Sequence, residues 1–264
     1  IRGAAGVEYG VGAIGGVIRV EPAELPFGGD LGGRVSLNAF SNNGQASGAA
    51  MLEGGVPGRP RLAWRAQSSG RRAGDSRTPD HIIENSAFSE VSARFEGGYE
   101  SDRLGLHVTA SHFGTTLGLF SGAHIGNYDD LLRAIELGRP SVSYDFGYDI
   151  EAPKQEVSHQ VLTARGHVRL PNGDWIEAQY GFQINRREEF DAHRRFGDPS
   201  ADPAFSLDLV TNTLDLKLRE QPHGRWLGVF GLSGMSQANT NGEAGLLIPN
   251  FRAYTTGLFA RETF

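Results

Sequence analysis

Residues 176–184 alternate strictly between apolar and polar side chains, and this alternation constrains the fold more than any other feature of the chain. The apolar positions are Ile176, Ala178, Tyr180, Phe182 and Ile184, and the positions between them are Glu177, Gln179, Gly181 and Gln183. Successive side chains of a β-strand point to opposite faces, so a period of two residues predicts a strand with one apolar and one polar face.

The same alternation recurs along the chain in segments of strand length. It is clear in 162–170 and 210–219, and fainter in 34–39, 91–100 and 104–111. Four more segments, at 46–56, 61–70, 225–237 and 254–264, alternate poorly and are placed mainly by their spacing. The turn sequence Pro171-Asn172-Gly173-Asp174 joins two of the clear segments and predicts that they pair as antiparallel neighbours. The sequence therefore predicts an all-β antiparallel fold of about ten strands.

Short and long connections alternate between these segments. The short ones are 57–60, 100–102, 171–174 and 221–224, and the long ones are 71–86, 115–155, 188–206 and 238–252. Only the first connection, at 42–45, is short where this parity predicts a long one. A transmembrane β-barrel shows such parity because one rim carries short turns and the other carries longer loops. Within 115–155 we expect one helix, capped by Asn127 and ended by Gly138 and Pro140.

In such a barrel the apolar face of each strand contacts lipid and the polar face lines the lumen. We therefore expect Ala178, Tyr180, Phe182 and Ile184 to face lipid, and Glu177, Gln179 and Gln183 to face the lumen. Arg165, His167 and Arg169 fall on the polar face of their segment and are expected to point inward.

A glycine-rich stretch at 6–20 precedes all of these segments. It contains the pattern G-x-G-x-x-G at 10–15, which is also the fingerprint of dinucleotide-binding folds. That fingerprint requires a helix that opens at the third glycine, whereas here Gly15 leads into Gly16, a β-branched run and then Pro22. The dinucleotide interpretation is therefore disfavoured, and the glycines indicate tight turns and close backbone approach.

Residues 1–20 resemble the end of the plug domain of TonB-dependent outer-membrane receptors. The matching positions are Arg2, Gly3, Tyr9, Gly10, Gly12, Gly15, Gly16, Val17, Ile18 and Val20. Ala4 departs from the pattern, because family members usually carry proline there. The resemblance implies the end of a plug at 1–20, a linker at 21–31 and the N-terminal part of a transmembrane β-barrel at 32–264. Barrels of this type have about 22 strands around a plugged lumen. We therefore expect the remaining strands to follow Phe264, and a signal peptide and coupling box to precede residue 1.

The same resemblance implies a function in uptake across the outer membrane. Members of this family take up scarce solutes, and their partner is the TonB-type energy-coupling complex of the inner membrane. Residues 247–251 and 257–260 are similar to a strand start of iron-chelate receptors, which favours a ferric siderophore as the extracellular ligand. An oligosaccharide, haem or cobalamin receptor is the alternative, and an outer-membrane barrel enzyme is a more distant one. We expect no resident cofactor.

Composition narrows the remaining classes. The chain has a formal net charge of −6, no cysteine and scattered arginines without a basic stripe, so nucleic-acid binding has little support. No apolar run approaches the roughly 18–20 residues of a membrane-spanning helix. The mean hydropathy of −0.34 suits a water-soluble protein, but alternating strands hide their apolar faces from such averages.

Candidate ligand-facing residues lie in two of the long connections. Glu188, Asp191 and His193 have side chains that bind hard cations or metals, but four neighbouring arginines favour a charged loop, and we predict no metal site. His124, Phe146 and Tyr148 are candidates for contact with haem or an aromatic chelate, and packing of the loop is the competing interpretation. No G-x-S-x-G or other nucleophile–histidine–acid set is recognisable, so we expect no enzymatic activity.

Overall fold

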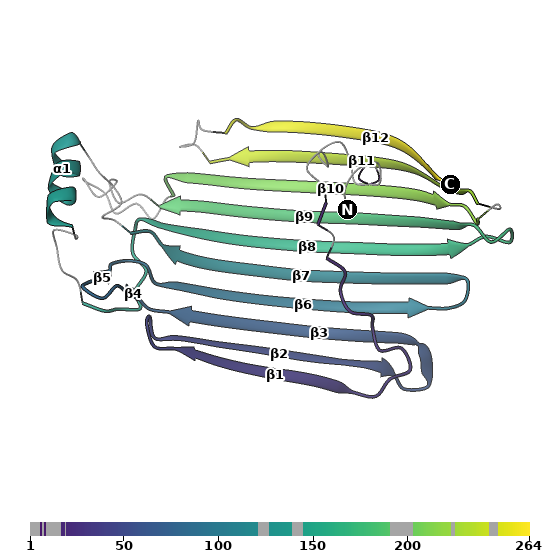
Figure 1. Cartoon of the computed structure of the whole chain (residues 1–264), viewed down its shortest axis with the longest axis horizontal. Helices are drawn as coiled ribbons and strands as arrows, with labels where there is room; N and C mark the ends of the chain where they lie inside the picture. The colour runs from purple at the N-terminus through teal and green to yellow at the C-terminus, as the bar shows by residue number, and fades with distance from the viewer. Residues whose placement is uncertain are drawn as a thin grey trace.

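The structure is a computed structural model that describes residues 6, 8, 17–18, 20–120, 127–138, 145–190, 203–222, 225–242 and 248–264. Ten strands lie side by side in a single antiparallel sheet, and each strand pairs with its neighbour in chain order (Figure 1). The prediction of an all-β antiparallel fold is confirmed.

The ten strands of the sheet are 9 to 16 residues long. They are β1 (Gly32–Phe40), β2 (Gln45–Val56), β3 (Arg59–Ala73), β6 (Phe88–Glu100), β7 (Leu104–Gly118), β8 (Lys154–Arg169), β9 (Trp175–Phe190), β10 (Phe205–Arg219), β11 (Leu227–Asn241) and β12 (Phe251–Thr263). A small hairpin of β4 (Ser76–Arg77) and β5 (Ile82–Ile83) lies between β3 and β6 and was not predicted. β1 and β12 form the two edges of the sheet.

The predicted parity of the connections is confirmed. In Figure 1 the short turns between β2 and β3, β6 and β7, β8 and β9, and β10 and β11 all lie at the right-hand end. The left-hand end carries the longer connections, which include β4, β5 and helix α1 (Tyr128–Leu137), together with the short turn between β1 and β2. The helix follows Asn127, whose carbonyl accepts a hydrogen bond from Leu131 N at 3.2 Å, and Gly138 ends it at a φ of +60°.

The register aligns apolar side chains in rows across one face of the sheet. Tyr180 pairs with Ala164 on β8 and Leu214 on β10, and Ala178 pairs with Gly166 and Leu216. Five such rows run from Ile176 to Ile184, which is about 27 Å along the strands at 3.4 Å per residue. This face is the apolar face. Its large side chains are exposed: Leu232 is 46% exposed and Leu258, on the edge strand, 84%.

The opposite, polar face carries the N-terminal segment. Residues 20–31 run across this face near the short-turn end, as Figure 1 shows. Leu25 is buried, and a side chain at Gly98 of β6 would come within 2.7 Å of it. The Phe27 ring packs edge-on against His107 of β7, with ring centroids 5.9 Å apart. The few buried apolar residues therefore lie under this segment or at strand ends, and most apolar surface is on the other face.

Candidate functional site

The polar face is the part of the molecule where charged side chains gather and meet another segment. On β8 and β9, His167 pairs across the strands with Glu177 and Arg165 with Gln179, so these residues share one face as predicted. His167 Nε2 lies 3.1 Å from Glu100 Oε1, and its ring packs edge-on against Trp175. The polar face is therefore a continuous surface of hydrogen-bonding groups, whereas the opposite face carries rows of apolar side chains with scattered polar ones such as Gln160 and Asn212.

Arg65 of β3 ties the N-terminal segment to this face. Its guanidinium donates to the carbonyl oxygens of Ala23 and Glu24, both at 2.8 Å. It also pairs with Glu53 of β2 at 2.7 Å and lies 3.8 Å from Glu96 of β6. Arg65 is only 5% exposed, so these partners compensate the cost of removing its charge from water. The planar guanidinium serves two carbonyls and two carboxylates at once, which a lysine cannot do.

Glu8, which precedes the N-terminal segment in the chain, makes a second attachment to the polar face, over β10 and β12. Its carboxylate accepts hydrogen bonds from Lys217 Nζ at 2.9 Å and from the Arg219 guanidinium at 2.6 Å, and Arg261 lies 3.7 Å away. Burial acts to raise the pKa of Glu8, but the hydrogen bonds and positive charges of Lys217 and Arg219 outweigh it and hold this pKa below its usual value. The carboxylate is therefore kept ionised.

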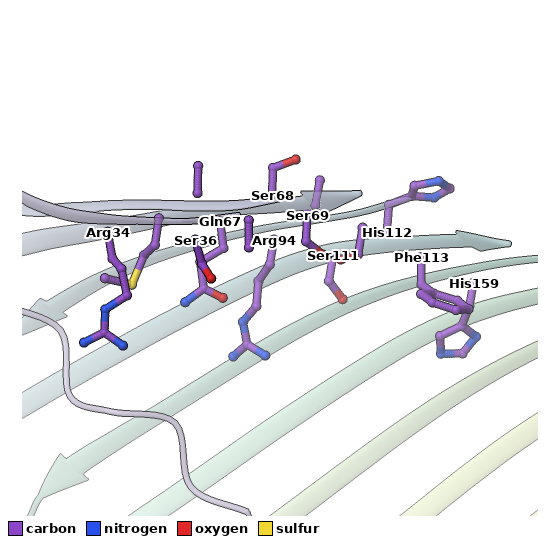
Figure 2. A pocket seen from close by; sticks show the side chains of 15 residues that line it. Arg34, Ser36, Gln67, Ser68, Ser69, Arg94, Ser111, His112, Phe113 and His159 are labelled. Carbon is purple, nitrogen blue, oxygen red and sulfur yellow. Dashed lines mark hydrogen bonds between the residues drawn. The ribbon is translucent and has the colours of Figure 1, made fainter. Parts of the chain in front are cut away.

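A cavity of about 420 Å³ lies on the polar face of β1, β2, β3, β6, β7 and β8. It is on the long-connection side of Arg65 and its partners, because Arg34 and Arg94 are two residues further along their strands in that direction. Figure 2 shows Arg34, Gln67, Arg94 and Phe113 directed to the same side of the sheet. Ser68 and His112 point to the other side (Figure 2), so they border the cavity only through their backbone end.

The charges around this cavity do not balance. Three arginines, at positions 34, 65 and 94, lie in two adjacent rows of the polar face that contain only two carboxylates, those of Glu53 and Glu96. Glu53 pairs with Arg65, and Glu96 accepts from Arg94 Nε at 2.6 Å. Within the described part of the chain, Arg34 has neither a hydrogen bond nor an ion pair. The cavity wall itself contains two arginines and no carboxylate, and it is therefore cationic.

Phe146 and Tyr148, two of the predicted ligand-facing residues, pack against neighbouring loops. Tyr148 Oη donates to the Gly44 carbonyl at 2.8 Å, and its ring lies edge-on to Phe146 with centroids 5.3 Å apart. The guanidinium of Arg77 lies over the Phe146 ring, 4.3 Å from its centroid. These are the contacts that the loop-packing interpretation requires, and contact of either ring with a ligand stays a prediction.

Asn85 organises the long-connection end and was not singled out by the sequence. Its amide nitrogen lies within hydrogen-bond distance of the carbonyls of Leu119, Glu151 and Pro153, at 2.8 to 3.0 Å. Its side-chain oxygen accepts from Glu151 N at 3.0 Å. One buried side chain in a left-handed backbone conformation, with a φ of 51°, thus joins three segments. Asparagine tolerates this backbone conformation better than most residues, and this preference is the only local feature of the sequence that could have pointed to Asn85.

The placement of Glu188 in a loop was wrong. Glu188 lies in β9, which continues to Phe190, and it pairs across the strands with Glu156 of β8. It is on the same side of the sheet as Ile184 and hence not on the polar face. The structural expectations for Asp191, His193 and His124 lie outside the described residues. So do those for the plug motif, at Arg2, Gly3, Tyr9, Gly10, Gly12, Gly15 and Gly16.

Comparison of the sequence with known proteins found no relative of this chain. The chain matches no protein-family model and no curated protein. Among the described residues there is no group of three or more metal-ligating side chains, and no helix is long and apolar enough to span a membrane. The two faces of the sheet, the attached N-terminal segment and the cationic cavity are therefore the features that bear on function.

Proposed function

We propose that this chain forms part of a TonB-dependent outer-membrane receptor. The ten strands of the large sheet lie in its barrel wall, residues 1–20 are the end of its plug, and residues 21–31 link the two. The observation that carries the proposal is the contrast between the faces. A band of exposed apolar side chains covers one face, and the other is polar and holds the chain's own N-terminal segment. Outer-membrane barrels have an apolar outer band about 25 Å tall and a polar interior, which in some barrels is plugged.

The two edges of the sheet support a larger barrel. Among the described residues β1 and β12 each pair on one side only, so each presents a row of backbone donors and acceptors. In lipid every such group left unpaired costs several kcal/mol, so a membrane-embedded sheet must close on further strands. Plugged transporters have about 22 strands, so the ten strands of this sheet would make up somewhat less than half of such a barrel.

The loop parity sets the orientation of the proposed receptor. Short turns mark the periplasmic rim and longer connections the extracellular rim in outer-membrane barrels. The end with helix α1, Phe146 and Tyr148 is then extracellular and receives the solute. The N-terminal segment crosses near the periplasmic end, where the energy-coupling protein acts on the plug. The resemblance of 247–251 to iron-chelate receptors favours a ferric siderophore as the solute.

Two measurements on the full-length receptor in its native cell test this function. Growth under iron limitation should require both the receptor and the energy-coupling protein. Epitope tags after Tyr128 and after Asn172 give the orientation, because only the first should be reachable on intact cells. Growth that is unchanged when the receptor is deleted would contradict an iron-uptake role. Exposure of the tag at Asn172 alone would contradict the orientation.

A further inference from the structure

The cationic cavity of Figure 2 has no partner assigned by the fold or by the proposed uptake function. Arg34 enters it from β1 and Arg94 from β6, with Met51 and Gln67 on the two strands between them. Three strand spacings of about 4.8 Å separate the two Cα atoms by about 14 Å along the sheet. Arginine side chains are long and flexible, so the two guanidinium groups can reach two carboxylates of one small solute from opposite sides.

We infer that this cavity binds a solute with at least two separated carboxylates, one held by Arg34 and one by Arg94. Guanidinium groups recognise carboxylates by paired, charge-assisted hydrogen bonds. Arg34 has its full set of donors available within the described residues. Arg94 uses Nε for Glu96, which leaves its two terminal nitrogens to face the cavity. A monocarboxylate reaches only one of the two groups, so the spacing selects polycarboxylates.

The rest of the lining fits such a solute. Gln67, Ser36 and Ser111 offer uncharged hydrogen-bonding groups between and beside the arginines. At the β7–β8 end, Phe113 and His159 provide flat walls, and Asn185 lies 3.1 Å from the His159 ring nitrogen and holds it in place. A volume of about 420 Å³ is in the range of small-molecule sites. The three arginines exceed the two carboxylates around the cavity by one positive charge, and a bound anion would compensate that charge.

This inference deepens the proposed function and rests on it for the origin of the solute. It names the ligand class as polycarboxylates, which include carboxylate-type iron chelates. Carboxylate side chains of a plug domain have the same chemistry, and the experiment must separate these two sources. A free solute competes from solution, whereas a plug side chain does not.

The test is calorimetric titration of the purified, folded full-length receptor with citrate, and with acetate as the monocarboxylate. Citrate should bind and acetate should not. Arg34→Gln and Arg94→Gln should each weaken citrate binding about 10- to 100-fold, because each variant loses charged hydrogen bonds to one carboxylate. Citrate affinity should also fall as salt is raised. The matched control is Arg71→Gln, because Arg71 lies on the same face but is half exposed and paired with Glu90. It should leave citrate affinity unchanged.

Three results would overturn the inference. One is no citrate binding tighter than about 1 mM by a receptor that is folded, as judged by the heat-dependent shift in its electrophoretic mobility. Another is equal weakening by Arg71→Gln. The third is unchanged citrate binding in both arginine variants together with new entry of a large antibiotic, which would assign the arginines to the plug. A receptor that resides in the outer membrane and takes up iron but fails these tests would retain its proposed function and lose only this site.

Discussion

The apolar and polar faces of the sheet belong to the same ten strands but satisfy their side chains in opposite ways. On the polar face Arg65 and Glu8 are almost fully buried and each meets several partners. On the apolar face Leu216, Leu232 and Leu258 line up in one row and nothing in the described chain covers them. Water-soluble monomers rarely expose such contiguous apolar surface. The sheet therefore buries charged side chains on one face and leaves large apolar side chains exposed on the other.

Removal of Arg65 should have the largest effect on the polar face. Arg65→Met leaves Glu53 without its cation, Glu96 with Arg94 alone, and two carbonyls without a donor, which we expect to cost about 3–5 kcal/mol. Arg71→Met is the matched control on the same strand and face, and it should cost no more than about 1 kcal/mol because that pair is exposed. Urea titration of the refolded full-length protein measures both. Equal losses would show that the Arg65 contacts do not anchor the segment.

A charge placed on the apolar face should have the next largest effect. Ala178→Arg lies opposite Gly166 and Leu216 in the middle of the apolar band and should cost about 2–4 kcal/mol in a bilayer. Gln179→Arg is the adjacent position on the polar face, between Asp215 and Arg165, and should cost less because its charge stays in the polar interior and has Asp215 as a partner. The folded fraction after insertion into lipid vesicles is the readout. A larger loss for Gln179→Arg would exchange the two faces.

Acid should weaken the attachment made by Glu8. Because the pKa of Glu8 is lowered in the folded chain, its contribution is complete above the usual carboxyl pKa of about 4.3 and is lost as pH falls through the lower folded value. Glu8→Gln should remove about 1.5–3 kcal/mol of this attachment at neutral pH and abolish that pH dependence. A spin label at Ala23→Cys reports the mobility of the segment. Asp30→Asn, an exposed carboxylate of the same segment, should behave as wild type.

The smallest effect is expected where the long-connection end packs. Tyr148→Phe removes the hydrogen bond to the Gly44 carbonyl and should lower stability by about 0.5–1.5 kcal/mol. The ring contact with Phe146 remains, so the loop should keep its position. Thermal unfolding of the two proteins measures the difference. If iron uptake falls sharply while stability is unchanged, Tyr148 contacts the ligand and does more than pack the loop.

The sequence predicts the sheet best where the apolar face carries large side chains. β8, β9 and β10 alternate clearly, whereas β2 and β3 place Gly48, Gly54 and Gly70 on that face and so lose the hydrophobic signal. Strand ends were predicted too early for a related reason. β9 continues beyond Ile184, but Arg186 and Glu188 occupy the apolar side there, so the alternation stops although the backbone ladder does not.

The candidate site was much less predictable than the sheet. Arg65 contacts carbonyls 41 and 42 residues away, and Glu8 contacts Arg219 from 211 residues away. The alternation of residues predicts that Arg34 and Arg94 lie on the polar face. It does not predict the strand register that brings them to one cavity. Local patterns therefore predict which face a residue occupies, and only the pairing of strands determines its neighbours.

Single-cysteine labelling of β9 tests the central claim most directly, because the chain contains no cysteine of its own. The full-length receptor would carry Cys at 178, 180, 182 or 184, or at 177, 179 or 183, in lipid vesicles. A membrane-soluble maleimide should label the even positions and a water-soluble one the odd positions. Reaction of the odd positions with the membrane-soluble reagent, or equal labelling of both sets, would contradict a sheet with its apolar face in lipid.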